Sequence, residues 1–558
     1  MFEFLKDSQK WQLARESDEY KPLRDILFDL YNTYCKDKPI PYLPYSLWLS
    51  TVKTGIRKQY DTLYLHRRFQ LGIYLVLSML YPENNEYLDK LHDLIAEICQ
   101  EYSWCLPVHL RPNELNNQRP LDLYACETGF YLAEIKYILG DKLSDLLAER
   151  ITALLKYRII DCVKEIPEFY ENNKTNWAAV CAGSCAMVMM YEDPDSYYEV
   201  QHRIDKSMES YLDGIDDDGF VGEGPGYWGY GFGFYIMYAD MLRRFTNGKV
   251  DKLKSPKVAR IAKFYSNMCM SNDCVYSYAD GSKELDYCIA GMYFLNKEFG
   301  TDIPSLEYAG LGVDKVAWML RSFLFFDPNI ASQGINNDTT YYKNSQLYIT
   351  RRDKYAFGVS ASNNKPGHNH LDIGSFVLVS DNKHIFTDLG PPLYTKHSLS
   401  IEGYSDTLER MSQGHSVPIV NGVGQGLGEE FYGKMSVSDN DISIDLKSAY
   451  PAKIEKLMRK IKLCDDKVII RDEFDKTAEI TERFITEIEP EISADSVRVD
   501  CVTVLFSKGM QASCKPQETF AHSGKSRTVY LLDFVKKSDC DFAEFEFLID
   551  KNATRNGK

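Results

Sequence analysis

The sequence predicts a chain in two parts, an all-helical first half followed by an antiparallel, sheet-rich second half. Up to about residue 326, apolar residues recur at the spacing of helices that bury one face. Beyond about residue 340, short alternating runs separated by turn formers such as Asn363-Asn364 indicate antiparallel strands. The polar, turn-rich stretch 327–342 is therefore the expected junction between an α domain over 1–330 and a β domain over 331–558.

In the first half, Pro, Gly and Asn separate about ten or more periodic segments. Helical hairpins in this number can form a bundle, a solenoid or a closed α/α toroid, and the lack of a fixed repeat period disfavours the solenoid. The expected helices cover 61–81, 86–102, 121–140, 143–163, 176–191, 196–213, 230–246, 256–271 and 314–326.

In the second half, many short strands at roughly regular spacing favour an antiparallel sandwich. An active site can form in the crevice between two such halves. The expected strands cover 346–350, 355–360, 374–381, 384–390, 441–450, 467–474, 502–509, 527–535 and 542–550.

Composition excludes several functional classes. The 558 residues are 44% hydrophobic and 26% charged, as in soluble globular proteins. A net charge of -16 disfavours a general nucleic-acid or anionic-membrane binder, since both need a basic surface. The 14 cysteines form no C-x-x-C pair, which favours reduced, buried thiols over a zinc ribbon. Aromatic content is 13%, with 39 Tyr, which suits core packing and also clefts that stack on sugars.

The first residues contain neither the apolar region nor the cleavage site of a signal peptide. No apolar stretch approaches the roughly 20 residues that span a bilayer. As written, the chain is expected in the cytoplasm; a trimmed signal peptide would instead imply the periplasm or secretion. The oligomeric state is left open.

One cluster of ligand-type residues lies in HNHLDIGSF and the segments after it. The motif holds His368, His370 and Asp372. The two histidines are two residues apart, so on a strand they face the same side. Asp388 and His415 follow beside further strand-like runs, and the chain has only 10 His. Histidine and aspartate are good ligands for zinc. The alternative is that these are polar residues at strand ends.

A second motif is the glycine-rich stretch 216–235, which we expect to form a loop before the next helix. It would hold Glu223, Tyr227, Trp228 and Tyr230, and aromatics with a carboxylate suit sugar binding and proton transfer. No Lys-Ser/Thr follows the glycines, so it is not a phosphate loop. The alternative is an aromatic-packed connection.

A third motif surrounds Asn176, where Thr175 or Asn176 is a natural N-cap. In a functional role, the Asn176 amide at a helix N-terminus would meet an anionic group. The small residues at 178–186 permit close helix packing. In YSWCLPVHL, Trp104 and His109 could line a cleft, although a structural histidine is the alternative.

Taken together, these motifs resemble the heparinase II/III-like superfamily of polysaccharide lyases. The resemblance spans about residues 100–430 and the α-then-β order. It implies an incomplete α/α toroid followed by an antiparallel β-sandwich. The motifs occur in family order as N-W-x-A-V-C at Asn176, D-G-x-x-x-E-G-x-x-Y ending at Tyr227, H-x-H-x-D-x-x-S-F from His368, Asp-Leu-Gly at 388–390 and H-S-V-x-I-V-N-G at 415–422.

The resemblance also implies roles for single residues. Asn176 matches the residue that neutralises a uronate carboxylate, Tyr227 the catalytic tyrosine and His368 the catalytic histidine. A structural divalent metal, expected to be zinc, would be bound by three further matches. Glu223 matches an acidic family position. The implied metal ligands are His370, Asp388 and His415, and the expected substrate-binding residues are Trp104, His109, Glu223, Trp228, Tyr230 and Arg352.

Two departures from the family pattern stand out. Asn369 separates the two histidines, where several relatives have Gly. Trp177 follows Asn176, where some members carry a His after the neutralising Asn or in its place. An acidic protein that binds a polyanion also needs local positive charge, for which the candidates are Lys174, Arg351, Arg352 and Lys365.

The implied reaction is β-elimination on a uronate-containing oligosaccharide or polysaccharide, which leaves a 4,5-unsaturated uronate. Donors such as Asn176 and His368 would stabilise enolate charge, a base would take the C5 proton and an acid would protonate O4. Tyr227 could serve as both base and acid, or His368 could be the base and Tyr227 the acid. Two alternatives are a toroidal glycoside hydrolase that uses acids among 216–218 and Glu223, and a non-catalytic carbohydrate-binding protein.

Overall fold

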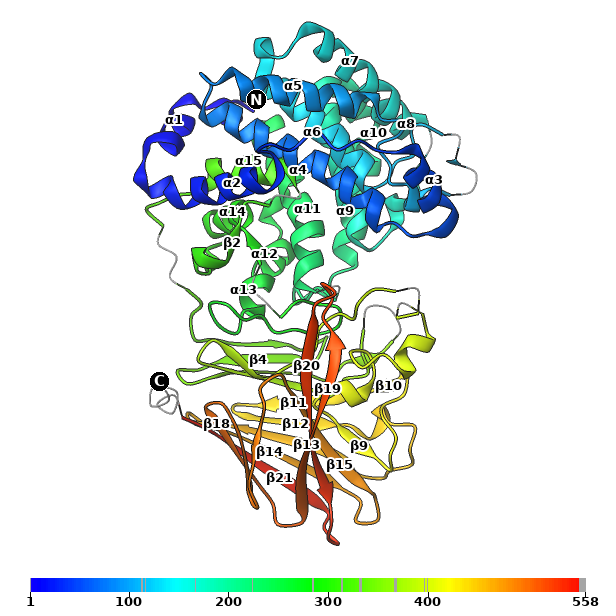
Figure 1. Ribbon diagram of the computed structural model, residues 1–558, viewed down its shortest axis with the longest axis vertical. Coiled ribbons are helices and arrows are strands. Elements are labelled where there is room, and N and C mark those ends of the chain that lie inside the picture. The colour runs from blue at the N-terminus through cyan, green and yellow to red at the C-terminus, as the bar shows by residue number, and fades with distance from the viewer. Residues whose placement is uncertain are drawn as a thin grey trace. The chain divides into compact units, whose positions relative to one another are not determined.

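The computed structural model describes residues 2–550 except 112–113, 116, 166, 223, 284–285, 313–314, 331–333, 366–368, 396 and 399. The chain forms two compact units, shown in Figure 1. The helical unit comprises Met1–Ile215, Tyr227–Ala262 and Asp286–Ser332. The sheet-rich unit comprises Asp216–Gly226, Lys263–Leu285 and Gln333–Lys558. The predicted order of helices and then antiparallel sheets is confirmed, and the sheet-rich unit also takes two segments from the helical half of the sequence.

The helical unit consists of helices with short connections, and a two-stranded parallel pair, β1 (Tyr287–Cys288) and β2 (Ala309–Gly310), lies beside them. Helix α13 (Phe264–Met268) belongs to the sheet-rich unit. The other helices are α1 (Ser8–Glu16), α2 (Lys21–Tyr34), α3 (Tyr45–Thr54), α4 (Lys58–Leu80), α5 (Asn85–Gln100), α6 (Leu123–Leu139), α7 (Asp145–Leu155), α8 (Asp161–Glu165), α9 (Asn176–Glu192), α10 (Pro194–Asp213), α11 (Pro225–Phe245), α12 (Pro256–Ala262), α14 (Ile289–Phe299) and α15 (Val316–Phe325).

Three helix boundaries differ from the sequence prediction. Helix α11 begins at Pro225 and not near 230, because proline at the first helical position has a suitable φ and lacks an N–H that would go unsatisfied. The segment 143–163 is interrupted by a π-helical turn at Lys156–Ile160. The segment 256–271 divides into α12 and α13. The glycine-rich loop is therefore shorter than predicted.

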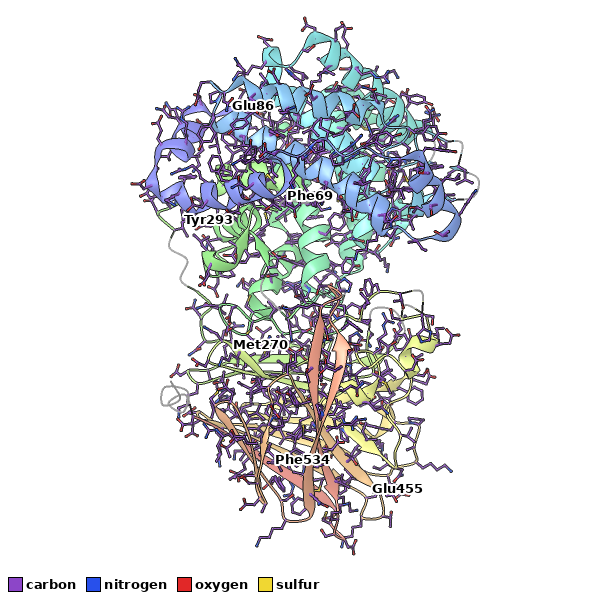
Figure 2. All side chains as sticks on the ribbon, viewed as in Figure 1. Phe69, Glu86, Met270, Tyr293, Glu455 and Phe534 are labelled. Carbon is purple, nitrogen blue, oxygen red and sulfur yellow. The ribbon has the colours of Figure 1, made fainter. Side chains whose placement is uncertain are left out.

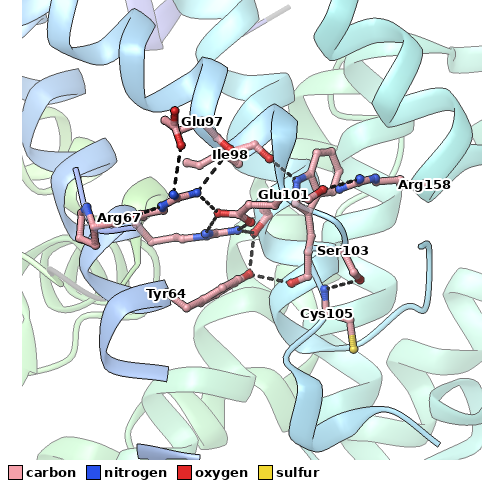
Figure 3. A network of polar contacts seen from close by, with 12 residues as sticks. Tyr64, Arg67, Glu97, Ile98, Glu101, Ser103, Cys105 and Arg158 are labelled. Atoms are coloured by element: carbon pink, nitrogen blue, oxygen red, sulfur yellow. Dashed lines mark hydrogen bonds and ion pairs between the residues drawn. The ribbon is translucent and has the colours of Figure 1, made fainter. Parts of the chain in front are cut away.

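The core of the helical unit lies around α4, α6 and α9, whose residues are buried on nearly every side. A polar network joins two of the helices within this core (Figure 3). The Glu101 carboxylate accepts hydrogen bonds from Arg68 at 2.7 Å and from Arg67 at 3.1 Å. Tyr64 donates to the carbonyl of Trp104 at 2.7 Å. Paired guanidinium groups compensate the buried carboxylate, so the network holds α4 against the end of α5.

The sheet-rich unit contains three larger antiparallel sheets and one small pair, β10–β6. The sheet orders are β11-β12-β13-β14-β21-β18-β17-β16, β19-β20-β15-β9 and β3-β4-β5-β7-β8. The strands are β3 (Thr339–Tyr342), β4 (Leu347–Arg351), β5 (Ala356–Ser360), β6 (Asn363–Asn364), β7 (Phe376–Ser380), β8 (Lys383–Phe386), β9 (Pro418–Val420), β10 (Gly428–Tyr432), β11 (Lys434–Ser438), β12 (Asp441–Asp445), β13 (Leu457–Leu463), β14 (Lys467–Phe474), β15 (Ile480–Thr486), β16 (Glu491–Ile492), β17 (Ser496–Val499), β18 (Val502–Phe506), β19 (Met510–Phe520), β20 (Ser526–Lys536) and β21 (Phe542–Ile549).

Phenylalanine rings from the three sheets meet in one core. Phe484 on β15 lies 4.9 Å from Phe545 on β21 and 5.3 Å from Phe376 on β7, measured between ring centroids. Phe534 on β20, labelled in Figure 2, lies 4.9 Å from Phe545. Burial alternates along β14 and β21, as expected for strands with one face on a core. The alternating sequence runs therefore point their apolar residues inward.

Two further sequence predictions can be compared with this fold. No disulfide joins the 14 cysteines that the structure describes, and most of them are buried, in agreement with the predicted burial. Within the described residues, no helix combines the length and the apolar character that a membrane span requires.

Candidate functional site

In the helical unit, Asn176 at the start of α9 packs against the face of α11 that carries Tyr227 and Gly231. Asn176 is the first residue of α9, follows the N-cap Thr175 and is 5% exposed. A Cβ added at Gly231 would lie 3.0 Å from the Asn176 Cβ, so the missing side chain lets Asn176 approach α11 closely. Tyr227 lies four residues before Gly231 and is half-buried. Residues i and i+4 of a helix share a face, so Asn176 lies one turn from Tyr227.

A buried ion pair lies beside this face. Lys315 Nζ is 3.1 and 3.2 Å from the two carboxylate oxygens of Glu127. Tyr131 donates to Glu127 at 2.7 Å, and Tyr230 donates to the same carboxylate. Lys315 Nζ also lies 3.9 Å from the ring centroid of Tyr230. Because Tyr230 is three residues after Tyr227 on α11, this cluster adjoins the Asn176 face.

The predicted position of Tyr230 needs a correction. Tyr230 lies on α11 and not in a loop, and its hydroxyl bonds Glu127. Burial, and then the Glu127 carboxylate, raises the pKa of Tyr230 well above its ordinary value. Burial also raises the pKa of Glu127, although the Lys315 ammonium opposes it. The Tyr230 hydroxyl therefore stays protonated and donates its hydrogen bond to the Glu127 carboxylate.

His109 is held by an aspartate at the start of α6. Its Nδ1 lies 2.7 Å from Asp122 Oδ2, and the same carboxylate accepts the Ala125 N–H at 2.7 Å as the helix N-cap. A carboxylate only accepts, so the His109 Nδ1–H donates to Asp122. The His109 ring is 5.2 Å from the Trp177 ring, between centroids. The structure thus brings a histidine against the residue that follows Asn176.

Two of the predicted substrate-binding residues are buried in the helical unit. The Trp104 indole is 1% exposed, donates to the carbonyl of Ile98 at 3.0 Å and lies under Arg158. The Trp228 indole is 4% exposed and donates to the carbonyl of Ile261 at 2.9 Å. Each tryptophan packs within the core and offers no open face for a sugar. The expectation of a loop that displays Trp228 is wrong, because α11 already includes this residue.

In the sheet-rich unit, three predicted metal ligands meet. His370 follows β6, Asp388 follows β8 and His415 precedes β9. One ligand atom from each lies within 4.8 Å of the others, and all three residues are buried. His415 Nδ1 is 3.0 Å from Asp388 Oδ2. Two imidazoles and a carboxylate at this spacing form a donor set that suits zinc.

The outer contacts of the two histidines turn the same nitrogen toward the cluster. His370 Nε2 lies 3.2 Å from Asp280 Oδ1, and His415 Nε2 donates to the carbonyl of Glu409 at 2.9 Å. Each Nδ1 then lies on the side of the cluster and can be a ligand atom, while the Nε2 is bonded outward as in metal-bound histidines. Among the described residues, the buried His370 Nδ1 has no hydrogen-bond partner. These residues therefore fit a divalent metal.

Three of the four cationic side chains predicted near the motifs have local partners. Arg352 bonds the side chain of Asn440 and lies 3.7 Å from Asp465. Lys365 pairs with Glu429 at the surface. Arg351 donates to backbone carbonyls of the segment 266–269, with the shortest bond, 3.0 Å, to Cys269. Arg351 is therefore a structural residue that holds this segment to β4.

Two predicted residues, Glu223 and His368, lie outside the described residues. Sequence reasoning missed Asp122, Asp280, Glu127 and Lys315. Asp122 had a signal, because an aspartate directly before a periodic segment is a helix N-cap. Lys315 lies 188 residues from Glu127, and no sequence motif marks either residue as a partner of the other.

Comparisons with known proteins agree with the predicted resemblance. Residues 335–478 match the family model "Heparinase II/III-like, C-terminal". No curated protein matches the sequence. The fold is similar to a heparinase III structure, with a TM-score of 0.59 and 13% identity over 89% of this chain and 78% of that one.

Two further structures show the same fold. A heparan sulfate lyase from Pedobacter heparinus has a TM-score of 0.61 and 12% identity, covering 98% of this chain and 87% of that one. The chondroitin AC lyase of Streptomyces coelicolor A3, solved in complex with chondroitin sulphate, has a TM-score of 0.56 and 10% identity over 98% and 83%. The α/α toroid and β-sandwich of these lyases match the two units described above.

Proposed function

We propose that this chain, which resembles heparinase II/III-like lyases in its sequence motifs and fold, cleaves uronate-containing glycans by β-elimination. The observation that carries the proposal is the placement of Asn176 one helical turn from Tyr227, against Gly231. An amide donor and a phenol on one face can act on one sugar ring. The product would carry a 4,5-unsaturated uronate.

Each step of the reaction needs a group of this kind. The C5 proton is poorly acidic until the neighbouring carboxylate charge is masked, and the Asn176 amide can donate to that carboxylate. Tyr227 would take the C5 proton and pass a proton to the departing O4 oxygen. An ordinary tyrosine pKa is about 10, so a tyrosinate needs a nearby donor or cation. His368, at its motif position, is our candidate for that donor or for the base itself.

His109 is the best-placed described histidine to assist Asn176. Asp122 fixes its tautomer, and the ring lies against Trp177, next in the chain to Asn176. A protonated His109 would add positive charge near a bound carboxylate. We therefore assign His109 a substrate-binding role, in place of the histidine that some relatives carry beside this asparagine.

The metal has a structural part in this proposal. His370, Asp388 and His415 would hold the ion, which we take to be zinc. When bound, the ion would cross-link three loops of the sheet-rich unit. His370 is two residues from His368 along the chain, so the ion would restrict the segment that carries that histidine.

The hydrolase alternative has less support. Asp216 accepts a hydrogen bond from Ser345, and Asp218 accepts the Asn344 N–H at 3.2 Å. Both carboxylates therefore hold the start of the loop after α10 to the β3–β4 turn. Paired acids for glycoside hydrolysis need to face a substrate instead.

A panel of heparan-type, chondroitin, hyaluronan and alginate substrates tests the proposal. Turnover should raise the ultraviolet absorbance of the conjugated unsaturated uronate, with zinc present. A panel that releases only saturated products would support the hydrolase, and binding without turnover would support the carbohydrate-binding alternative. Either result contradicts the lyase proposal.

A further inference from the structure

Asp280 is a fully buried carboxylate that contacts the metal cluster from a distant segment of the chain. Its side chain is 1% exposed, and its oxygens lie 3.2 Å from His370 Nε2 and 3.3 Å from Arg410 Nη2. Both partners are themselves buried. Burying a carboxylate costs free energy unless its partners are well placed, so the side chains around Asp280 must keep their positions for this carboxylate to stay buried.

We propose that Asp280 is a positioning residue of the metal centre and that metal binding, through Asp280, fixes the backbone that leads into Tyr227. The inference rests on the proposed metal centre and extends it to a segment, 263–285, that the sequence places in the helical half. It makes one ion responsible for order in two regions of the chain.

The first step concerns the tautomer of His370. An Asp280 carboxylate that accepts from Nε2 keeps the proton there and leaves the Nδ1 lone pair for the ion. Arg410 binds the other carboxylate oxygen and restricts its rotation. The orientation of His370 is thus determined before the ion arrives.

The second step concerns the turn that carries Asp280. Ala279, directly before it, has φ +53°, a left-handed conformation that a non-glycine residue rarely adopts without support. Ser277 supplies part of that support, because its hydroxyl donates to the Gly281 carbonyl at 2.9 Å and lies 3.5 Å from Asp388 Oδ1. The turn 277–281 therefore contacts two of the three metal ligands.

The third step leads from this turn to Tyr227. A Cβ added at Gly281 would lie 3.7 Å from Pro225 Cδ, so the turn packs closely on the start of α11. Tyr278 donates its hydroxyl to the Val221 carbonyl at 2.5 Å. Pro225 is two residues before Tyr227. A shift of the turn on metal loss would therefore reach the backbone ahead of Tyr227.

The test uses the full chain with Asp280→Asn, which keeps the volume and removes the charge. Zinc affinity is measured by competition with a chromophoric chelator, and backbone order by hydrogen exchange of 217–226 and 275–283. We expect affinity to fall 10- to 100-fold, in the range measured for outer-shell partners. Both segments should exchange faster in the variant, and in the wild type after chelation. Asp465→Asn, an exposed carboxylate, is the matched control.

The outcomes separate this inference from the proposed function. Wild-type zinc binding with an unchanged affinity in Asp280→Asn, or no change of exchange at 217–226 on chelation, overturns the inference and leaves the metal centre standing. A wild type that binds no zinc overturns both. If Asp280→Asn does not fold, Ser277→Ala decides, since it removes no buried charge. We expect it to weaken zinc binding several-fold, and unchanged binding and exchange would overturn the inference.

Discussion

The two units hold their candidate functional residues in different ways. In the helical unit, Asn176 and Tyr227 are placed by helix register and by the space at Gly231, and the neighbouring Glu127 already has Lys315 as a partner. In the sheet-rich unit, the three candidate metal ligands come from loops, and the buried His370 Nδ1 lacks a hydrogen-bond partner among the described residues. In the helical unit, protein side chains supply the partners of the buried charge, whereas in the sheet-rich unit a bound ion would supply the partner that His370 Nδ1 lacks.

The largest expected effect is the loss of turnover when the Tyr227 hydroxyl is removed from the helical unit. Tyr227→Phe removes the phenol and keeps the ring, so binding should persist while turnover falls about 10³-fold, as for a lost general acid-base group. The measurement is the initial rate of unsaturated-uronate formation on the best substrate of the panel. Tyr432→Phe, in the exposed strand β10, should leave the rate unchanged. A Tyr227→Phe enzyme with the wild-type rate would remove Tyr227 from the mechanism.

The second prediction addresses the buried ion pair. Lys315→Met leaves the Glu127 carboxylate without its ammonium partner, which should lower the free energy of unfolding by about 3 kcal/mol. Urea unfolding followed by circular dichroism measures this loss. Adding Glu127→Gln should recover most of it, since no unpaired charge then remains. If Lys315→Met is as stable as the wild type, the pair does not hold α6 and α15 together.

The sequence predicted these two arrangements unequally. Motif order located Asn176 and Tyr227, and the family resemblance singled out His370, Asp388 and His415 as metal ligands from a wider group of ligand-type residues. The glycines were interpreted as a loop, but within α11 they provide room for close contacts, as Gly231 does for Asn176. A single sequence cannot distinguish a glycine that bends the backbone from one that admits a neighbour.

Contacts between distant segments were not predictable. Asp280 lies 90 residues from His370 and comes from a stretch with helical periodicity, yet it belongs to the sheet-rich unit. The position of Arg352 near the motifs in sequence predicts a cationic cleft, whereas its partners are Asn440 in the β11–β12 turn and Asp465 in the β13–β14 turn. Proximity along the chain did not show which partner a charge would have.

Removing the metal tests the sheet-rich unit in the same comparison. A chelator should lower the thermal midpoint of the sheet-rich unit and leave hydrogen exchange in α6 and α9 unchanged. At free zinc 100 times Kd, the expected loss of stability is about 2.7 kcal/mol. His415→Ala should abolish the response to chelator, and His397→Ala, an exposed histidine, should keep it. Equal responses in the two units would contradict a metal effect confined to the sheet-rich unit.

The smallest expected effect concerns pH. Burial, and then the neighbouring Glu171, raises the pKa of Glu168 in the helical unit to about 7. Between about 4.5 and 7 the folded chain therefore holds more protons than the unfolded one, so the stability from this group falls as pH rises through that window. Allowing for solvent screening, we expect a loss of about 1 kcal/mol, measured by urea unfolding at several pH values. Glu168→Gln should flatten the profile.

The sheet-rich unit should show the opposite trend. The Lys460 ammonium, 2.8 Å away, lowers the pKa of Glu473 to about 2. Here the unfolded chain holds more protons between about 4.5 and 2, so this contribution is present above pH 4.5 and is lost as pH falls. The hydrogen-exchange protection of β13 and β14, taken relative to the intrinsic exchange rate at each pH, should therefore fall in acid while that of η7 (Phe169–Asn172) rises. If both regions responded to pH with the same sign, these two carboxylates would not control the local pH response.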